Sequence, residues 1–375
     1  MESTAYKYRI YPYEEQRHFF AVNFGCCRFV YGQALNWRTL AYNADGTSLS
    51  YEDTNLALTQ TKKFYPWLKE ADSASLQMSL RDLDRAFTNF FEGRADYPVF
   101  KKKHSRQSYT TPMNGNSIKV TEDTVTLPKV GAVPYKQHRK IKPGGKLKSA
   151  TVSKDPDGCY YISLTYEYPE PIHTSVVDSS KSIGLDMSME HFYVDSNGDT
   201  ADVPHFYRLM EAKLAREQAK LSMMTKGSNN YNKQKHRIAK LHAKTKHQRS
   251  DILHKLSYNL VNAYDVICIE DLNMKAMSQG LNLGKSVHDL GWGMFVSMLE
   301  YKCKRYGKVL VKVDRSYPSS KTCHKCGHVN KDLKLSDRAY ICPECGNLID
   351  RDWQAALNIL DEGLRSSSGR LPCAD

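Results

Sequence analysis

The stretch CHKCG (323–327), followed by CPECGNLIDRDWQAALNIL (342–360), places a metal-binding pattern directly before an acidic helix start. Two Cys-x2-Cys pairs separated by fifteen residues match the spacing of a zinc ribbon, in which each pair supplies two thiolates to one tetrahedral ion. A redox Cys-x2-Cys motif would not need the second pair. Four thiolates leave no open position on zinc, so the predicted zinc ion is structural. Its predicted ligands are Cys323, Cys326, Cys342 and Cys345.

Three acidic residues occupy the ends of predicted elements. Asp186 lies at the end of an apolar strand pattern, Glu270 ends the apolar run VICI, and Asp352 opens the helical pattern after the ribbon. Each acid alone is also typical of a helix cap or a strand end. Together they suit Mg²⁺, which prefers oxygen ligands, and two such ions about 4 Å apart can promote phosphodiester hydrolysis. Two strands and a C-terminal helix bring acids together in this way in an RNase H-like fold.

The composition favours a polyanionic partner. Lys and Arg number 54 against 41 Asp and Glu, which gives a formal net charge of +13. The region 205–255 alone carries 13 basic and three acidic residues. No apolar run is long enough to predict a membrane span, and the first residues do not resemble a signal peptide. Ten cysteines, four of them in metal spacing, favour a reduced, intracellular protein.

The order of the patterns predicts an α+β protein of several domains. YKYRIYP (6–12) alternates as a strand, residues 13–94 are mostly helical, and β-type runs follow to about residue 168. We therefore expect a β-barrel-like domain (1–12 and 95–180) with a helical insert (13–94). The second half predicts an RNase H-like α/β domain (181–318 and 347–362) that contains the zinc ribbon (319–346). Residues 363–375 are expected to form a disordered tail.

Segments along nearly the whole chain resemble TnpB, a family of transposon-encoded RNA-guided nucleases related to type V CRISPR effectors. The likeness is carried by YKYRIYPYEEQ, FGCCRFVYGQAL, LQMSLRDLDRAFTNFF, YPVFKKK, GLDMSMEHF, HKLSYNLV, IEDLNMKAM, GWGMF, SYPSSKTCHKCG and CPECGNLIDRDWQAALNIL. The resemblance implies a RuvC-like, Mg²⁺-dependent DNA endonuclease with Asp186, Glu270 and Asp352 as catalytic acids and ligands of two ions. In the segment DRD (350–352), the second aspartate, Asp352, matches the family, and Asp350 is expected to act as a cap or a local partner.

Two positions depart from the family pattern. Ser188 replaces a usual glycine and Gln354 a usual asparagine, and both leave the level of activity open. Some relatives have lost catalytic acids and act as guided repressors, so a guide-dependent DNA-binding repressor is the alternative function. A DNA-joining transposase of RNase H-like fold is a third interpretation, which the TnpB-like segments disfavour.

The resemblance also implies the partners: a guide RNA from the protein's own locus and target double-stranded DNA with a short flanking motif. One chain would act as a monomer on one RNA, in the prokaryotic cytoplasm at the nucleoid. Heteroduplex binding requires positive charge without sequence preference, for which Lys101, Lys102, Lys103 and Arg106 are candidates. The residues that align with readers of the flanking motif are Tyr51, Asn55, Gln77 and, more weakly, Asn114.

Overall fold

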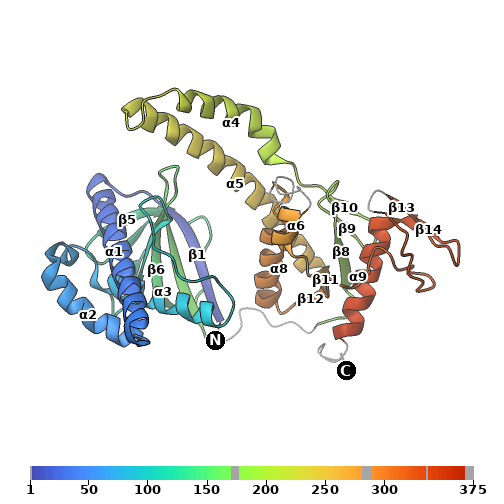
Figure 1. Ribbon diagram of the computed structural model, residues 1–375, viewed down its shortest axis with the longest axis horizontal. Coiled ribbons are helices and arrows are strands. Elements are labelled where there is room, and N and C mark those ends of the chain that lie inside the picture. The colour runs from blue at the N-terminus through green and yellow to red at the C-terminus, as the bar shows by residue number, and fades with distance from the viewer. Residues whose placement is uncertain (1, 170–176, 281–288, 335–336, 368–375) are drawn as a thin grey trace. The chain divides into compact units, whose positions relative to one another are not determined.

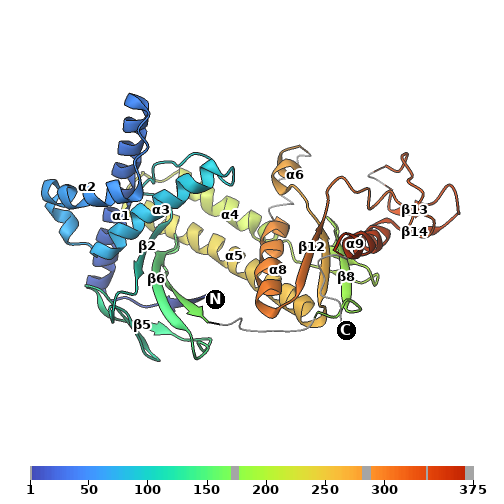
Figure 2. The same ribbon diagram turned by 90° about the horizontal axis from the view of Figure 1, so that it is seen from below.

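The computed structural model describes residues 2–169, 177–280, 289–334 and 337–367 (Figures 1 and 2). The chain forms two compact units, Met1–Glu170 (unit 1) and Pro171–Asp375 (unit 2). Each unit has its own hydrophobic core and is described separately.

Unit 1 contains an antiparallel sheet of seven strands in the order β2-β6-β7-β1-β5-β4-β3. β1 (Glu2–Ile10) alternates strictly, because Tyr6, Tyr8 and Ile10 are buried while the residues between them are exposed. It pairs with β7 along its whole length, from Glu2 opposite Tyr168 to Ile10 opposite Tyr160. The other strands are β2 (Gln107–Pro112), β3 (Lys119–Val120), β4 (Thr124–Leu127), β5 (Gly131–Lys136), β6 (Lys146–Lys154) and β7 (Tyr160–Tyr168).

A helical block separates β1 from β2 in sequence, as the pattern predicts. It consists of α1 (Glu14–Asp45), α2 (Tyr51–Phe64), the 3-10 helix η1 (Pro66–Lys69) and α3 (Ser73–Phe91). Asp72 caps α3, because its carboxylate accepts hydrogen bonds from the backbone N–H groups of Ala74 and Ser75. The apolar stripe of α3 is buried against the core at Leu76, Leu80 and Leu83.

Unit 2 contains a mixed sheet of five strands in the order β10-β9-β8-β11-β12. β8 (Ser182–Met187), β11 (Val266–Glu270) and β12 (Val309–Val313) run parallel, and β9 (Tyr193–Asp195) and β10 (Thr200–Ala201) are antiparallel additions at one edge. The helices are α4 (Phe206–Ser222), α5 (Asn229–Ala263), α6 (Met274–Gly280), α8 (Trp292–Tyr306) and α9 (Arg351–Ser367). The ribbon segment adds a hairpin of β13 (Ala339–Ile341) and β14 (Leu348–Asp350).

Alternate residues of the unit 2 strands face different helices. Ile183, Leu185 and Ile267 share a buried cluster with residues of α5 and α8. Val266 and Cys268 belong to a second cluster with Ile359 of α9. The sheet is therefore covered by α5 and α8 on one face and by α9 on the other. Because side chains alternate along a strand, this arrangement determines which helix each polar residue at a strand end faces.

α9 lies unusually close to the sheet. A Cβ atom added at Gly184 would stand 2.2 Å from the carbonyl oxygen of Ala356, and one at Gly363 would stand 2.4 Å from Cys268 Sγ. The helix extends to Ser367, and Gly363 and Ser367 are buried. The prediction of a disordered tail from residue 363 is therefore wrong for 363–367, because these residues pack on the sheet. Residues 368–375 lie outside the described ranges.

Among the described helices, none combines the length and the apolar character that crossing a membrane requires.

Candidate active site and metal centre

Strand alternation places Asp186 and Glu270 on the sheet face that α9 covers. Leu185 of β8 pairs in parallel with Ile269 of β11, and both belong to the cluster on the α5 and α8 side. The next residue on each strand, Asp186 and Glu270, therefore turns to the opposite face. Two acids separated by more than eighty residues in sequence thus end neighbouring strands side by side.

Asp352 enters the same region in the first turn of α9. The preceding acid caps the helix, because Asp350 Oδ1 accepts hydrogen bonds from the backbone N–H groups of Asp352 (3.0 Å) and Trp353 (2.9 Å). The prediction that Asp350 serves as a cap is confirmed. Trp353 Nε1 donates to the carbonyl oxygen of Ser196 (3.1 Å), which ties the start of α9 to the end of β9.

The negative charges of Asp352 and Glu270 both act on Asp186. Burial raises the pKa of Asp186 well above its usual range, and the negative charges of Asp352 and Glu270 raise it further. Burial also raises the pKa of Glu270. Their oxygens are not all within 4.8 Å of one another, since the cysteines form the only such group among the described residues. Carboxylate oxygens are the ligand type that magnesium prefers, and a magnesium site at these acids stays a prediction.

Two arginines contact Asp352. Arg351 Nη2 lies 3.1 Å from its Oδ1, and Arg338 Nη1 lies 3.6 Å from its Oδ2. Arg338 also reaches Glu190 Oε2 at 3.9 Å. Sequence reasoning missed Arg338, because its approach depends on the fold of the ribbon rather than on any local pattern. Arg351 stands between the two aspartates of DRD, and this position next to Asp352 could have indicated the contact from the sequence alone.

The two departures from the family pattern make definite contacts. Ser188 is buried, and its Oγ donates to Asp352 Oδ2 at 3.3 Å. Gln354 is fully buried, and its Oε1 accepts a hydrogen bond from the backbone N–H of His324 at 3.5 Å. Ser188 thus contacts Asp352, whereas Gln354 connects α9 to the ribbon.

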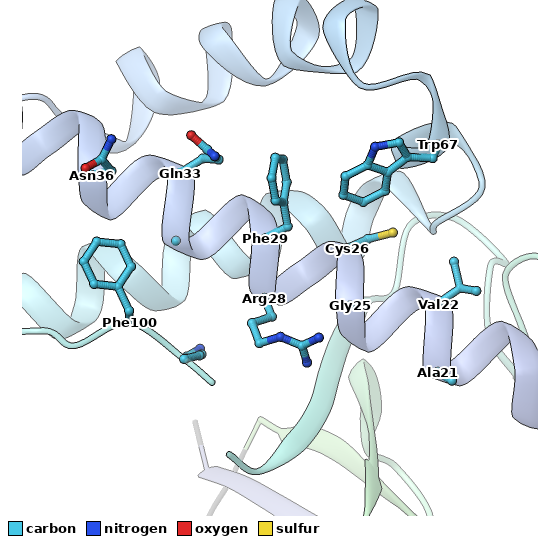
Figure 3. Close-up of a pocket in the computed structure, with 12 residues that line it drawn as sticks. Ala21, Val22, Gly25, Cys26, Arg28, Phe29, Gln33, Asn36, Trp67 and Phe100 are labelled. Carbon is cyan, nitrogen blue, oxygen red and sulfur yellow. The ribbon is translucent and has the colours of Figure 1, made fainter. Parts of the chain in front are cut away.

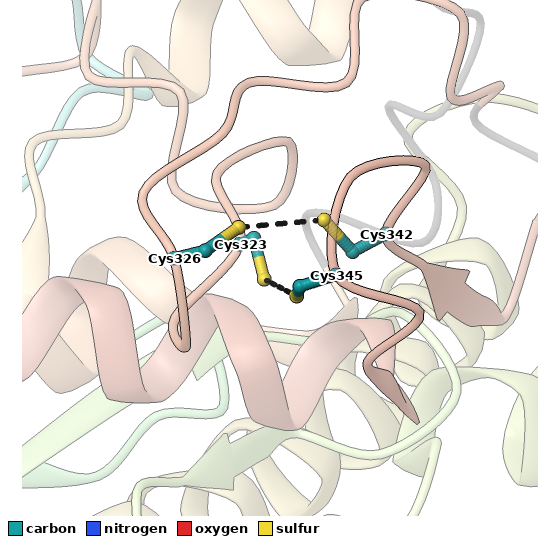
Figure 4. Close-up of side chains that lie close together, drawn as sticks. All are labelled: Cys323, Cys326, Cys342 and Cys345. Carbon is teal, nitrogen blue, oxygen red and sulfur yellow. Dashed lines mark hydrogen bonds between the residues drawn. The ribbon is translucent and has the colours of Figure 1, made fainter.

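The four cysteines of the ribbon converge (Figure 4). Cys323 Sγ lies 3.7 Å from Cys345 Sγ, and Cys326 Sγ lies 3.6 Å from Cys342 Sγ. These separations exclude disulfides, which require about 2.0 Å between sulfurs. Four sulfurs placed about 2.3 Å from one zinc ion stand about 3.8 Å apart in a tetrahedron. The cluster therefore fits a structural zinc ion, with every coordination position taken by a thiolate.

The ribbon is attached directly to α9. Asn358 Nδ2 donates to the carbonyl oxygens of Ser319 and Thr322, both at 2.7 Å. His324 Nδ1 lies 3.4 Å from Asp361 Oδ2. At the start of the helix, the Arg351 backbone N–H donates to the Arg338 carbonyl oxygen at 2.8 Å. The ribbon therefore contacts the helix that carries Asp352 along several turns.

The candidate readers of a flanking motif lie mainly on α2 and α3. Tyr51 and Asn55 stand one turn apart on α2, and Gln77 is exposed on α3. Arg81, one turn after Gln77, places its guanidinium 5.2 Å from the ring centroid of Tyr51. Asn55 Oδ1 is buried and has no hydrogen-bond partner. Asn114 is exposed in the turn after β2. Their role as nucleic-acid contacts stays a prediction.

The candidate backbone contacts are all exposed in the loop between α3 and β2: Lys101, Lys102, Lys103 and Arg106. The basic region 205–255 forms α4 and most of α5, which pack against each other as a helical hairpin. Glu217 of α4 is buried near the turn of this hairpin, where Gln234 Nε2 of α5 donates to its carboxylate at 2.8 Å. This contact holds the two basic helices together.

Three family models match parts of the chain. Residues 1–47 match a "Helix-turn-helix domain", residues 163–280 a "Probable transposase", and residues 292–359 a "Cas12f1-like, TNB domain". Within 2–45 the structure has strand β1 followed by the single long helix α1, so this stretch does not form a helix-turn-helix. The third match spans the cysteines and the start of α9.

Whole-chain relatives are also found. A Streptomyces pristinaespiralis protein named "Putative RNA-guided DNA endonuclease" is 37% identical over 97% of this chain and 90% of its own length. "Putative RNA-guided DNA endonuclease InsQ" of Escherichia coli K12 is 32% identical over 96% of this chain and 92% of its own. A solved Cas12f1–sgRNA–target DNA complex resembles this fold with a TM-score of 0.60 at 15% identity, covering 92% of this chain and 83% of that one.

Proposed function

Because this chain belongs to the TnpB (OrfB) family of IS605 transposon proteins, we propose that it is an RNA-guided DNA endonuclease that cuts target DNA beside a short flanking motif. The observation that carries the proposal is the placement of Asp186 and Glu270 near the ends of neighbouring parallel strands, on the sheet face that α9 covers and where Asp352 begins that helix. The strand order, with three parallel strands and two antiparallel edge strands, supports an RNase H-like, RuvC-type assignment.

In this proposal Asp186, Glu270 and Asp352 would hold two magnesium ions. When bound, the ions supply electrostatic stabilisation for an attacking water and for the leaving oxygen of the phosphodiester. Arg338 and Arg351 offset part of the negative charge around Asp352 before nucleic acid arrives. Ser188 orients the Asp352 carboxylate through its hydroxyl.

The remaining parts of the chain would hold RNA and DNA. We assign the α4–α5 hairpin and the loop with Lys101, Lys102, Lys103 and Arg106 to backbone contacts, since both are basic and exposed. Tyr51, Asn55, Gln77 and Asn114 are assigned to the flanking motif. The guide RNA would come from the protein's own locus, with one chain acting on one RNA.

The test is purification of the protein together with RNA expressed from its own locus. The complex is then offered a matching target with randomised flanking bases. The proposal predicts magnesium-dependent cuts in a subset of the library that shares one motif. Guide-dependent binding without cuts would favour the repressor function, and strand-transfer products from a donor end would favour a transposase.

A further inference from the structure

Unit 1 contains a cavity of about 670 Å³ along one side of α1. Of the candidate site residues named above, only Lys101 lines it. Figure 3 shows Trp67 and Phe100 toward opposite ends of this stretch of α1, with Phe29 between them. Arg28, Gln33 and Asn36 of α1 also line the cavity, which we call the α1 groove. Its volume is within the range of about 300–1,000 Å³ that is typical of small-ligand sites.

The aromatic walls of the α1 groove are only partly covered by the protein. Phe29 meets Trp67 edge to face, with ring centroids 4.9 Å apart. Trp67 nevertheless remains 40% exposed and Phe100 57% exposed. Large aromatic surfaces left in water at the rim of a cavity are typical of binding sites rather than of folding cores.

Two glycines in the floor of the groove have no role in the packing of unit 1. Gly25 and Gly32 lie in the interior of α1, a helix of 32 residues. An added Cβ would meet only Arg28 Nη2 at 3.8 Å or Phe100 Cδ1 at 3.6 Å, both ordinary contacts. Each glycine costs the helix about 1 kcal/mol relative to alanine. A ligand that approaches the helix backbone closely would explain why no side chain occupies these positions.

The charges of the groove favour an anion. Arg28 Nη1 donates to Gln107 Oε1 at 3.3 Å, and this bond leaves other guanidinium N–H groups for a ligand. Lys101 also lines the groove, with its Nζ 3.8 Å from the Tyr31 ring centroid, and Lys102 and Lys103 follow it in sequence. The groove therefore combines flat apolar walls with positive charge.

We propose that the α1 groove binds an unpaired nucleotide of a single-stranded nucleic acid. This inference rests on the proposed function as a nucleic-acid enzyme. The base stacks on Trp67 or Phe100, its phosphate faces Arg28 and Lys101, and the amide of Gln33 or Asn36 meets a base edge. A paired base has its faces covered by its neighbours, so only an unpaired one offers the surface that these aromatics fit.

The test is photocrosslinking of single-stranded 12-nucleotide RNA and DNA probes that contain 5-bromouracil. The full-length Asp186→Ala protein, freed of nucleic acid, is used so that binding is measured without cleavage. We expect crosslinks at Phe29, Trp67 or Phe100. The probe that gives the higher crosslinking yield, RNA or DNA, identifies the ligand. Gly32→Leu, which fills the groove, and Trp67→Ala should each reduce these crosslinks about tenfold.

Three controls keep the test specific. Phe64→Ala removes an aromatic that is 80% exposed outside the groove, and it should leave the crosslinks unchanged. Gly25→Ala and Gly32→Ala should keep or raise the unfolding temperature, which shows that α1 tolerates side chains there.

Three outcomes would overturn the inference even if the wild type cuts guided DNA. They are crosslinks confined to other segments, the absence of any crosslink, and crosslinking of Gly32→Leu at the wild-type level. Groove crosslinks in a protein that never cuts DNA would instead reject the proposed nuclease and leave the groove as a nucleotide site.

Discussion

Two aspartates that are two residues apart have different surroundings at the start of α9. Asp350 Oδ1 accepts hydrogen bonds from the backbone N–H groups of Asp352 and Trp353, so it completes the first turn of the helix. Asp352 instead adds its negative charge to the burial that raises the pKa of Asp186, and it contacts Ser188 and two arginines. The proposed chemistry belongs to Asp352 alone, because Asp350 is already used by the backbone.

Amide substitutions separate these two roles. Asp352→Asn keeps the shape of the side chain but removes its charge, and we expect guided cleavage to fall at least about a thousandfold, in line with losses of essential catalytic groups. Asp350→Asn is the matched control, because asparagine caps helices about as well as aspartate. It should cleave within about threefold of the wild type in a single-turnover assay. Equal losses in both variants would contradict the assignment.

At the residue level, the sequence indicates candidate acids where a pattern marks the end of an element, and their catalytic role stays a prediction. Asp186, Glu270 and Asp352 could be named because each stands where a strand ends or a helix begins. The contacts of Ser188 and Arg338 with Asp352 could not be predicted, since they join segments far apart in sequence. Their geometry depends on how close α9 lies to the sheet and on how the ribbon folds.

At the scale of elements, α9 is held from two sides. Its inner face packs on β8 and β11, where Gly184 allows the helix backbone to approach the strand. The ribbon is bonded to it through Asn358, Gln354 and the backbone of Arg351. The position of Asp352 relative to the strand acids therefore depends on both contacts.

Gly184→Ala should displace α9. The added Cβ would stand 2.2 Å from the carbonyl oxygen of Ala356, so the helix must move away from β8. We expect a lower unfolding temperature by several degrees and a loss of most cleavage activity. Gly293→Ala in α8 is the control, because its Cβ would meet only Met274 Cγ at 3.8 Å. If Gly184→Ala matches this control in thermal unfolding and cleavage, the close approach is not essential.

The zinc ribbon gives a prediction about metal content. Metal analysis of the purified protein should find about one zinc per chain, because the four thiolates converge on one position. Cys342→Ser should lose the zinc, lower the unfolding temperature of unit 2 and reduce cleavage, since α9 loses its outer support. A Cys342→Ser protein that stays folded and fully active would contradict the supporting role.

Lys302 gives a prediction about pH. It is buried between α8 and α5, and its Nζ donates to His254 O at 2.6 Å and Ser257 Oγ at 2.8 Å. Burial lowers the pKa of Lys302 to about 8. The unfolded chain, with a lysine pKa of about 10.4, binds more protons between these values, so stability from this group rises with pH from about 8 to about 10.4.

Lys302→Met removes the titrating group and isolates its effect. Unfolding temperatures of the wild type and this variant are compared at pH 7.5 and at pH 9.5, chosen on either side of the lowered pKa. We expect the wild type to gain stability relative to Lys302→Met at the higher pH. A difference that stays constant or changes in the opposite direction would show that the lysine is not destabilised by burial.

At the scale of the whole molecule, the chain consists of two units with separate cores. The sequence predicts an α+β chain, because alternation and helical periodicity are local signals. It could not predict the strand orders, since β1 pairs with β7 more than 150 residues away in sequence. The sequence also carried no signal for the α1 groove, which forms only when η1 and the segment around Phe100 pack beside α1.

The most direct test of the account is cleavage of one plasmid that carries a guide-matched target and the selected flanking motif. The account predicts cutting that requires the RNA, magnesium and the wild-type acid at position 186, with Asp186→Ala still copurifying with RNA. Cutting that survives Asp186→Ala, or no cutting by the wild-type protein when RNA, target and magnesium are all present, would contradict it.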